Sequence, residues 1–279
     1  MDGPAGSQKF HLAQHDAVAW LRALPSESVD LVVTDPPYES LEKHRAIGTT
    51  TRLKHSKSSS NDWFAIFPNA RFPELFAELH RVLRRNTHFY LFCDPETMFV
   101  AKPAGEQAGF KFWKPLIWNK VRIGMGYHYR ARYECILFFE KGKRKLNDLG
   151  IADIIEAPRI SGGYPAEKPA KVSEVLIRQS TEPGLLVIDP FMGSGSVGVA
   201  ALTSGRRFAG NDLCKEAVDA TRARLCEAGG SEVGSFAALV EEAEAGEHGR
   251  AGRMRPSEQL GLSGLEDRPD TAEGASGAR

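Results

Sequence analysis

Two short apolar segments each run without a break into a motif rich in chemically useful residues. Val29–Val33 is followed by Asp35-Pro36-Pro37-Tyr38, and Leu185–Ile188 leads into Asp189-Pro190-Phe191-Met192-Gly193-Ser194-Gly195. Apolar runs of this length are typical of parallel strands that are buried on both faces. The carboxyl ends of parallel strands share one edge of a sheet, where open α/β sheets bind ligands. The sequence therefore predicts that the two motifs meet at that edge.

Amphipathic segments alternate with the apolar ones, which predicts an α/β fold with helices on both faces of the sheet. Helices are expected near residues 16–24, 72–83, 171–180 and 215–227, with another from about residue 197. Besides the two strands above, strands are expected at 10–12, 88–92, 114–118, 133–139 and 207–213.

Charge is unevenly distributed along the 279 residues, although 36 basic and 36 acidic residues balance overall. Residues 230–279 hold ten acidic residues against five arginines, so residues 1–229, with 31 basic and 26 acidic residues, carry a net charge of +5. The acidic tail is rich in Gly, Ala and Glu, a composition that cannot bury enough apolar surface to order a chain. A folded domain is expected over 1–229 and a mostly disordered tail over 230–279, with helix extending no further than Ala245.

The sequence lacks the features that are typical of several other classes of protein. The apolar runs fall short of the roughly 20 residues that cross a bilayer, and the N-terminus has no secretory pattern, so a cytoplasmic protein is expected. The four cysteines have no CxxC spacing, which argues against a zinc site or a disulfide scaffold, and no metal is expected. No Gly-Lys-Ser/Thr follows the glycine pair, which argues against a nucleotide hydrolase.

The Asp35-Pro36-Pro37-Tyr38 motif combines hydrogen-bond acceptors with an aromatic ring. Two prolines fix the backbone and supply no N–H donor, so a carboxylate and at least one carbonyl are held in place. Such a site suits a flat group that carries an NH2, whose hydrogens the acceptors bind while the ring stacks on its face. The alternative is a plain turn with a capping carboxylate and a packed tyrosine.

The glycine motif follows a strand and precedes a helix, so a ligand can approach its backbone closely and meet N–H groups. Asp212 ends the next strand, 17 positions beyond Gly195. A Rossmann-like fold places a carboxylate for a ribose diol at about that distance. The alternative for Asp212 is a helix N-cap.

Together the motifs resemble those of the exocyclic-amino DNA methyltransferases that use S-adenosylmethionine. In that family Asp-Pro-Pro-Tyr is the catalytic motif and Phe-x-Gly-x-Gly, here Phe191-x-Gly193-x-Gly195, is the cofactor motif. The catalytic motif comes first by about 155 residues, the order of the permuted group called β. Leu24-Pro25-x4-Val29-Asp30-Leu31 and Glu167-Lys168-Pro169 are also typical of the family, and the similarity covers most of 10–225.

This resemblance implies a Rossmann-like methyltransferase fold: a mostly parallel seven-stranded sheet with helices on both faces and a circularly permuted motif order. It implies catalytic roles for Asp35, Pro36, Pro37 and Tyr38. For the cofactor, it implies that Asp189, Phe191, Gly193, Gly195 and Ser196 wrap the methionine part, Asp212 accepts from the ribose, Lys168 lies near the carboxylate, and Asp16 and Ala17 touch the adenine. For Lys168 the alternative is an exposed lysine. Asn211 departs from the family, where an apolar residue usually precedes the acid.

Double-stranded DNA is the implied partner, and two basic stretches inserted at about 39–62 and 120–133 are expected to contact it. The expected contact residues are Lys43, Arg45, Arg52, Lys54, Arg122, His128, Arg130 and Arg132. A bacterial or phage enzyme is implied, and a homodimer too, because the β group often dimerises. Whether the enzyme belongs to a restriction-modification system stays open.

The first residue of the catalytic motif bears on the substrate. In the family, Asp at this position accompanies N6 of adenine more often, whereas Ser is more usual for N4 of cytosine. Relatives that methylate RNA or a protein side-chain amide more often begin the motif with Asn. A non-catalytic DNA-binding module would need neither the acid at position 35 nor the glycines at 193 and 195. The sequence therefore favours an adenine N6 methyltransferase that flips its target base, with the N4-cytosine enzyme as the main alternative.

Overall fold

The computed structural model describes residues 7–40, 65–124, 128–160 and 167–241. Met1–Ala243 form one compact unit, and Glu244–Arg279, a separate unit, lie outside the described residues. Residues 41–64, which hold most of the basic stretch expected at about 39–62 and its residues Lys43, Arg45, Arg52 and Lys54, also lie outside them.

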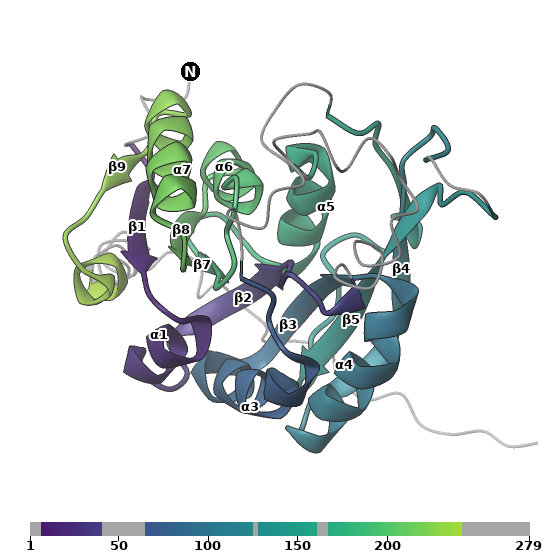
Figure 1. Ribbon diagram of the computed structural model, residues 1–279. Coiled ribbons are helices and arrows are strands. Elements are labelled where there is room, and N and C mark those ends of the chain that lie inside the picture. The colour runs from purple at the N-terminus through teal and green to yellow at the C-terminus, as the bar shows by residue number, and fades with distance from the viewer. Residues whose placement is uncertain (1–6, 41–64, 125–127, 161–166, 242–279) are drawn as a thin grey trace, which may run out of the picture. The chain divides into compact units, whose positions relative to one another are not determined.

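A single mixed sheet forms the centre of the compact unit (Figure 1). Its strands are β1 (Lys9–Gln14), β2 (Val29–Thr34), β3 (Leu83–Cys93), β4 (Lys111–Asn119), β5 (Tyr133–Lys141), β6 (Ile154–Glu156), β7 (Leu186–Asp189), β8 (Arg207–Asp212) and β9 (Ser231–Glu232). The strand order is β6-β4-β5-β3-β2-β7-β8-β1-β9. In the described part of the chain, only β5 runs antiparallel to its neighbours. The sheet is thus mostly parallel, as expected, but has nine strands rather than seven because short strands are added at both edges.

Helices cover both faces of the sheet. α1 (Ala17–Ala23), α3 (Phe72–Val82) and α4 (Pro95–Gln107) lie on one face, and α5 (Ala170–Ser180), α6 (Ser196–Thr203) and α7 (Lys215–Glu227) lie on the other (Figure 1). A 3-10 turn, η3 (Asn69–Arg71), leads into α3. The sequence did not predict α4, because Pro103 inside it interrupts the helical pattern.

The position of β2 follows from its sequence. All six of its residues are buried, since helices cover the strand on both faces and β3 and β7 pair with it on either side. Val32 packs in the core under α1 and α3, whereas Leu31 and Val33 pack in the core under α5 and α6. Because a central strand of this kind is held from all sides, the catalytic-type motif begins at a rigid point of the fold.

The folded unit continues beyond residue 229, the boundary expected from composition. β9 pairs with β1, and residues 236–241 form a helical turn whose Phe236 and Leu239 are buried. The Arg207 guanidinium donates to the carbonyl of Leu239. These contacts, with the ion pair between Arg222 and Glu232 and the hydrogen bond from the Val233 N–H to the Phe10 carbonyl, hold this segment on the domain.

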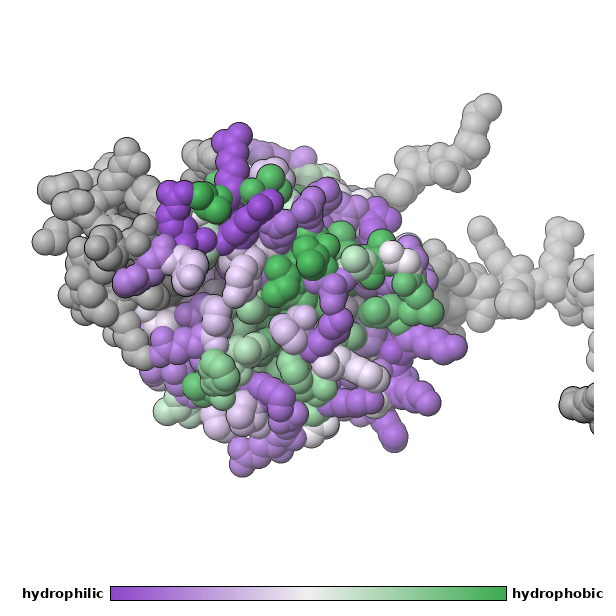
Figure 2. Space-filling model, turned by 90° about the vertical axis from the view of Figure 1, so that its right-hand side faces the viewer, coloured by the Kyte–Doolittle hydropathy of each residue, from purple (hydrophilic) through white to green (hydrophobic). Residues whose placement is uncertain are grey.

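The side of the molecule where β4 and α4 lie shows hydrophobic residues gathered among hydrophilic ones (Figure 2). Exposed apolar side chains of these elements and of the neighbouring edge strand include Phe99, Trp113 and Ile154. That the protein forms a homodimer remains a prediction.

None of the described helices is both long and apolar enough to span a bilayer.

Candidate active site

Four acidic residues stand where parallel strands end, at one edge of the sheet. Asp35 is the first residue after β2, and Asp16 is the second residue after β1. Asp189 and Asp212 are the last residues of β7 and β8. All four line a single cavity of about 600 Å³, a volume typical of small-ligand sites. The expectation that the two motifs meet at this edge is confirmed.

Asp35 presents its carboxylate to this cavity with both oxygens engaged. Tyr38 donates its hydroxyl to Oδ1 at 3.1 Å, and the Lys168 ammonium donates to Oδ2. Burial raises the pKa of Asp35, while the positive charge of Lys168 opposes that rise. The motif is therefore more than a turn with a capping carboxylate, since Asp35 binds a cation and still faces the cavity.

Lys168 lies in the wall of the cavity, and its side chain is largely shielded from solvent. Its side chain is 11% exposed, and its Nζ lies 3.2 Å from Glu134 Oε2 as well as against Asp35. Glu134, the second residue of β5, also accepts from the buried ammonium of Lys120. The exposed-lysine alternative is wrong, and Lys168 sits beside the Asp-Pro-Pro-Tyr motif as well as in the wall of the cavity.

The glycine turn after β7 depends on the absence of side chains. Gly195 has a φ of +75°, and a Cβ there would lie 2.6 Å from Cγ2 of Thr221. The Thr221 hydroxyl donates to the carbonyl of Gly193 at 2.9 Å, and the Gly193 N–H donates to Asp212 Oδ2 at 3.0 Å. Gly193 lines the cavity, whereas Gly195 packs behind it and precedes Ser196 at the start of α6.

Asp212 is held by backbone N–H groups. Besides Gly193 it accepts from the N–H of Cys214 at 2.9 Å. Burial raises its pKa, and these N–H bonds oppose the rise. Cys214, not Asp212, is the N-cap of α7, so the capping alternative is wrong and the carboxylate is available at the cavity wall.

Asp189, the last residue of β7, has a buried carboxyl group. Thr34 donates to its Oδ1 at 2.6 Å and the N–H of Phe191 at 3.0 Å. Burial raises its pKa to about 7, because these two bonds only partly replace lost hydration. Among the described residues no cation forms a salt bridge with Asp189 or Asp212, so a positively charged ligand would meet two acidic groups and no competing cation in this half of the cavity.

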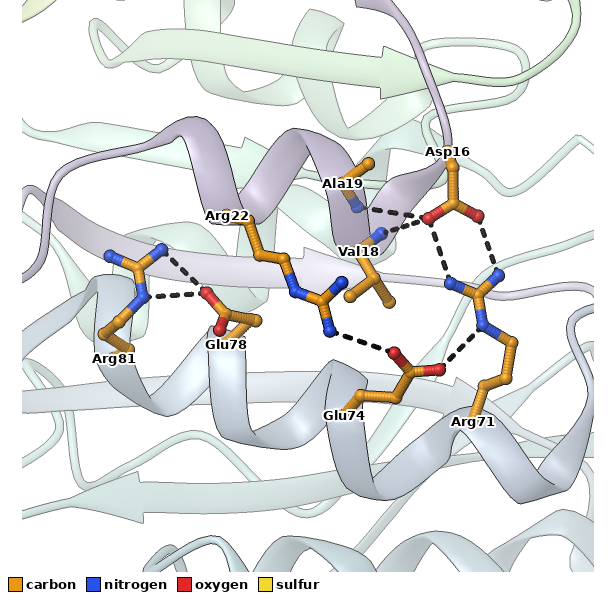
Figure 3. Close-up of polar contacts among 8 residues, drawn as sticks. All are labelled: Asp16, Val18, Ala19, Arg22, Arg71, Glu74, Glu78 and Arg81. Atoms are coloured by element: carbon orange, nitrogen blue, oxygen red, sulfur yellow. Dashed lines mark hydrogen bonds and ion pairs between the residues drawn. The ribbon is translucent and has the colours of Figure 1, made fainter.

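Asp16 caps α1 and anchors the neighbouring helix (Figure 3). Its Oδ1 accepts from the N–H groups of Val18 and Ala19, both at 3.1 Å. The Arg71 guanidinium binds both Asp16 oxygens, at 2.7 and 2.9 Å. The hydrogen bond from Arg71 lowers the pKa of Asp16 to about 2. The pair ties the end of β1 to η3, just beyond the undescribed residues 41–64.

Phe67 joins the two motifs. Its N–H donates to the carbonyl of Pro37 at 2.7 Å, and its ring meets that of Phe191 edge to face, with centroids 5.1 Å apart. The Arg71 guanidinium lies over the same ring, 5.1 Å from its centroid. Phe67 thus packs between the segment after β2 and the turn after β7, and it lines the cavity.

The hydrogen bonds of the Asn211 side chain give a reason for a polar residue at this position. Its amide donates to the carbonyls of His15 and Pro190, and its oxygen accepts from the N–H of His15 at 3.0 Å. This fully buried amide connects the ends of β1 and β7. An apolar residue here would leave those backbone groups without partners, so Asn211 supports the floor of the site.

The structure brings together the residues expected for catalysis and cofactor binding. Those that line the cavity are Asp16, Ala17, Asp35, Pro36, Pro37, Tyr38, Lys168, Asp189, Phe191, Gly193, Ser196 and Asp212. Sequence reasoning missed Glu134, Lys120, Arg71 and Phe67, and it noted Asn211 only as a departure from the family pattern. Of these, Glu134 follows a run of basic and aromatic residues but carries no motif of its own.

The expected DNA-contact residues that the structure describes do not line this cavity. The described ones lie between β4 and β5: the three loop arginines (Arg122, Arg130 and Arg132) and His128. All four are exposed. The loop leaves β4 at Asn119 and enters β5 at Tyr133, beside Glu134, so it emerges at the cavity edge of the sheet.

A glycine turn after one strand, an acid after the next and a cavity at their common edge define the Rossmann-like class of enzymes that bind a nucleoside cofactor. The chain matches the family model N6_N4_Mtase, described as DNA methylase, over residues 29–155 and 151–223. It belongs to this family.

Individual relatives agree with the family match. The chain is 30% identical to the inferred methylase YubD of Escherichia coli (strain K12) over 214 residues, 76% of this chain and 88% of the relative. It is 26% identical to the DNA adenine methyltransferase YhdJ of the same organism over 260 residues, 79% of this chain and 84% of the relative. TTHA0409 of Thermus thermophilus, an inferred DNA modification methylase solved with S-adenosyl-L-methionine, has the same fold, with a TM-score of 0.60 at 22% identity over 79% of this chain and 94% of that one.

Proposed function

We propose that this DNA methyltransferase transfers a methyl group from S-adenosylmethionine to the exocyclic N6 of an adenine flipped out of duplex DNA. The observation that carries the proposal is that Asp35 and Gly193 line one cavity. A methyl donor and a methyl acceptor that bind at these two motifs meet without any rearrangement of the sheet.

The residues of the cavity fit S-adenosylmethionine. Asp212 offers acceptors for ribose hydroxyls, and the turn at Gly193 lets a ligand approach the backbone. Asp189 and Asp212 offer this half of the cavity two acidic groups, and the positive charge of a bound sulfonium would favour their ionised forms. When bound, the cofactor supplies an electrophilic methyl group.

The other half of the cavity suits an amine. The Asp35 carboxylate and the Pro36 carbonyl accept the two amine hydrogens, which directs the nitrogen lone pair away from the base plane. An exocyclic amine is a poor nucleophile because its lone pair is delocalised into the ring, so this positioning supplies much of the rate. Tyr38 lines the same cavity and stacks on the base.

DNA contacts fall to the loop arginines and to the basic stretch at 41–64. The loop emerges at the cavity edge, where phosphates on either side of a flipped nucleotide would lie. Arginines at this place neutralise phosphates and hold the duplex in register.

Nucleoside mass spectrometry tests the proposal. The full chain is incubated with S-adenosylmethionine that carries a deuterated methyl group and with unmethylated plasmid DNA and added RNA, which are then digested to nucleosides. Labelled N6-methyldeoxyadenosine is the expected product. Labelled N4-methyldeoxycytidine would overturn the choice of base, and label found only in added RNA would overturn the choice of nucleic acid.

A further inference from the structure

Four charged side chains form one buried chain behind the proposed amine site. Lys120 contacts Glu134 Oε1, Lys168 lies 3.2 Å from Glu134 Oε2, and Lys168 contacts Asp35 Oδ2. Lys120 directly follows β4 and Asp35 directly follows β2. Glu134 is the second residue of β5, and Lys168 lies two residues before α5. Asp35, Glu134 and Lys168 line the cavity, and of these Asp35 belongs to the motif that is proposed to bind the substrate amine.

The two lysines are shielded from water and their charges are balanced. The side chains of Lys120 and Lys168 are 7% and 11% exposed. The Lys168 ammonium also lies 5.6 Å from the centre of the Phe92 ring, and that of Lys120 lies 5.1 Å from that of Trp118. A buried ammonium is stable only beside opposite charge, so each lysine requires the carboxylates that it touches.

We propose that Lys168, held in place by Glu134 and Lys120, is a positioning residue that keeps the Asp35 carboxylate ionised and aimed into the cavity. The inference rests on the proposed function, in which Asp35 accepts hydrogen bonds from the substrate amine. A protonated Asp35 would present a donor where the amine needs an acceptor. Tyr38 fixes Oδ1 and Lys168 fixes Oδ2, so the remaining lone pairs have a defined direction.

The charged and titratable groups around Asp35 act in opposite directions. Lys168 favours its ionised form, whereas the negative charge of Glu134 disfavours it. Among the described residues, the other groups whose charges interact with Asp35 or with this chain include Tyr38, Cys93, Cys135, Asp189 and Arg159. Removal of Lys168 and removal of Glu134 should therefore shift the titration of Asp35 in opposite senses, which loosened packing alone would not produce.

Carbon-13 NMR of the aspartate side-chain carboxyls in the full chain tests this directly, with the Asp35 signal assigned through Asp35→Asn. We expect Lys168→Met to raise the titration midpoint of Asp35 by about 1 to 3 pH units. Glu134→Gln is expected to lower the midpoint. Lys168→Arg, which keeps the charge, should leave the midpoint near that of the wild type. Lys171→Met, an exposed lysine of α5, is the matched control and should change nothing.

Methyl transfer to unmethylated plasmid DNA, measured as kcat against pH, should follow the same order. The acid limb moves to higher pH in Lys168→Met and to lower pH in Glu134→Gln. Equal midpoints in the wild type and Lys168→Met, or shifts of the same sign in both variants, would overturn the inference. If Lys168→Met does not fold, Glu134→Gln decides alone, since an unshifted midpoint contradicts the inference. Opposite midpoint shifts in a protein that methylates no nucleic acid would support the charge chain and refute the proposed function.

Discussion

Gly195→Ala is the substitution whose effect the structure defines most closely. At a φ of +75° an alanine is strained, which costs about 1–2 kcal/mol. Its Cβ would lie 2.6 Å from Cγ2 and 2.7 Å from Oγ1 of Thr221, so Thr221 must move. That movement breaks the 2.9 Å hydrogen bond to the Gly193 carbonyl, a loss of about 1 kcal/mol. The expected total is about 2–3 kcal/mol.

The cost of the Gly195→Ala substitution is seen either in the stability of the protein or in its affinity for S-adenosylmethionine. If the turn keeps its shape, the free energy of unfolding falls by that amount. If the turn relaxes, S-adenosylmethionine must restore it, and calorimetry gives a Kd raised by roughly 30- to 150-fold. Gly184→Ala is the matched control, because Gly184 has a φ of +90° but no atom within 4 Å of its Cβ position. A Gly195→Ala protein that equals Gly184→Ala in both measurements would refute the reasoning.

Two further predictions concern charge. Burial raises the pKa of Asp189 to about 7, so the folded state favours the protonated acid and stability falls as the pH rises from about 4 to about 7. Asp189→Asn, whose amide oxygen can accept the same bonds, should therefore raise Tm more at about pH 8.5 than at about pH 5, and an equal gain at both would contradict this assignment. Alanine at all three loop arginines should lower the slope of log Kd for duplex DNA against log salt by about one for each phosphate that is no longer neutralised. Arg178→Ala, at the far end of α5, should leave that slope unchanged, and an unaltered slope in the triple variant would exclude the loop from the DNA interface.

The cavity could be predicted from the sequence because parallel strands bring their carboxyl ends to one edge. The apolar runs before Asp35 and Asp189 identified two such ends, and the acid spacing identified a third at Asp212. β2, β7 and β8 are adjacent in the sheet, so residues more than 150 positions apart line the same cavity. Local pattern and one topological rule were sufficient for this part of the site.

The charge chain could not be predicted in the same way. Glu134 is the second residue of β5, the antiparallel strand, so the amino end of that strand reaches the cavity edge. Only the pairing of β5 with β3 and β4 reveals this, and such pairing is not encoded in a local pattern. Lys168 was expected near the cofactor, but its contact with Asp35 depends on where α5 begins. The ion pair between Arg71 and Asp16 joins residues that are 55 positions apart in the sequence. Neither residue lies in a sequence pattern that predicts this contact.

The central claim is that donor and acceptor bind in one cavity at two separable motifs, with Asp35 serving the acceptor. The most direct test compares Asp35→Ala with the wild type by calorimetry with S-adenosylmethionine and by single-turnover transfer of a tritiated methyl group to unmethylated plasmid DNA. The account predicts a Kd for S-adenosylmethionine that stays near that of the wild type, with a rate of transfer reduced by about a thousandfold. Wild-type rates in Asp35→Ala, or a loss of cofactor affinity as large as the loss of rate, would contradict it.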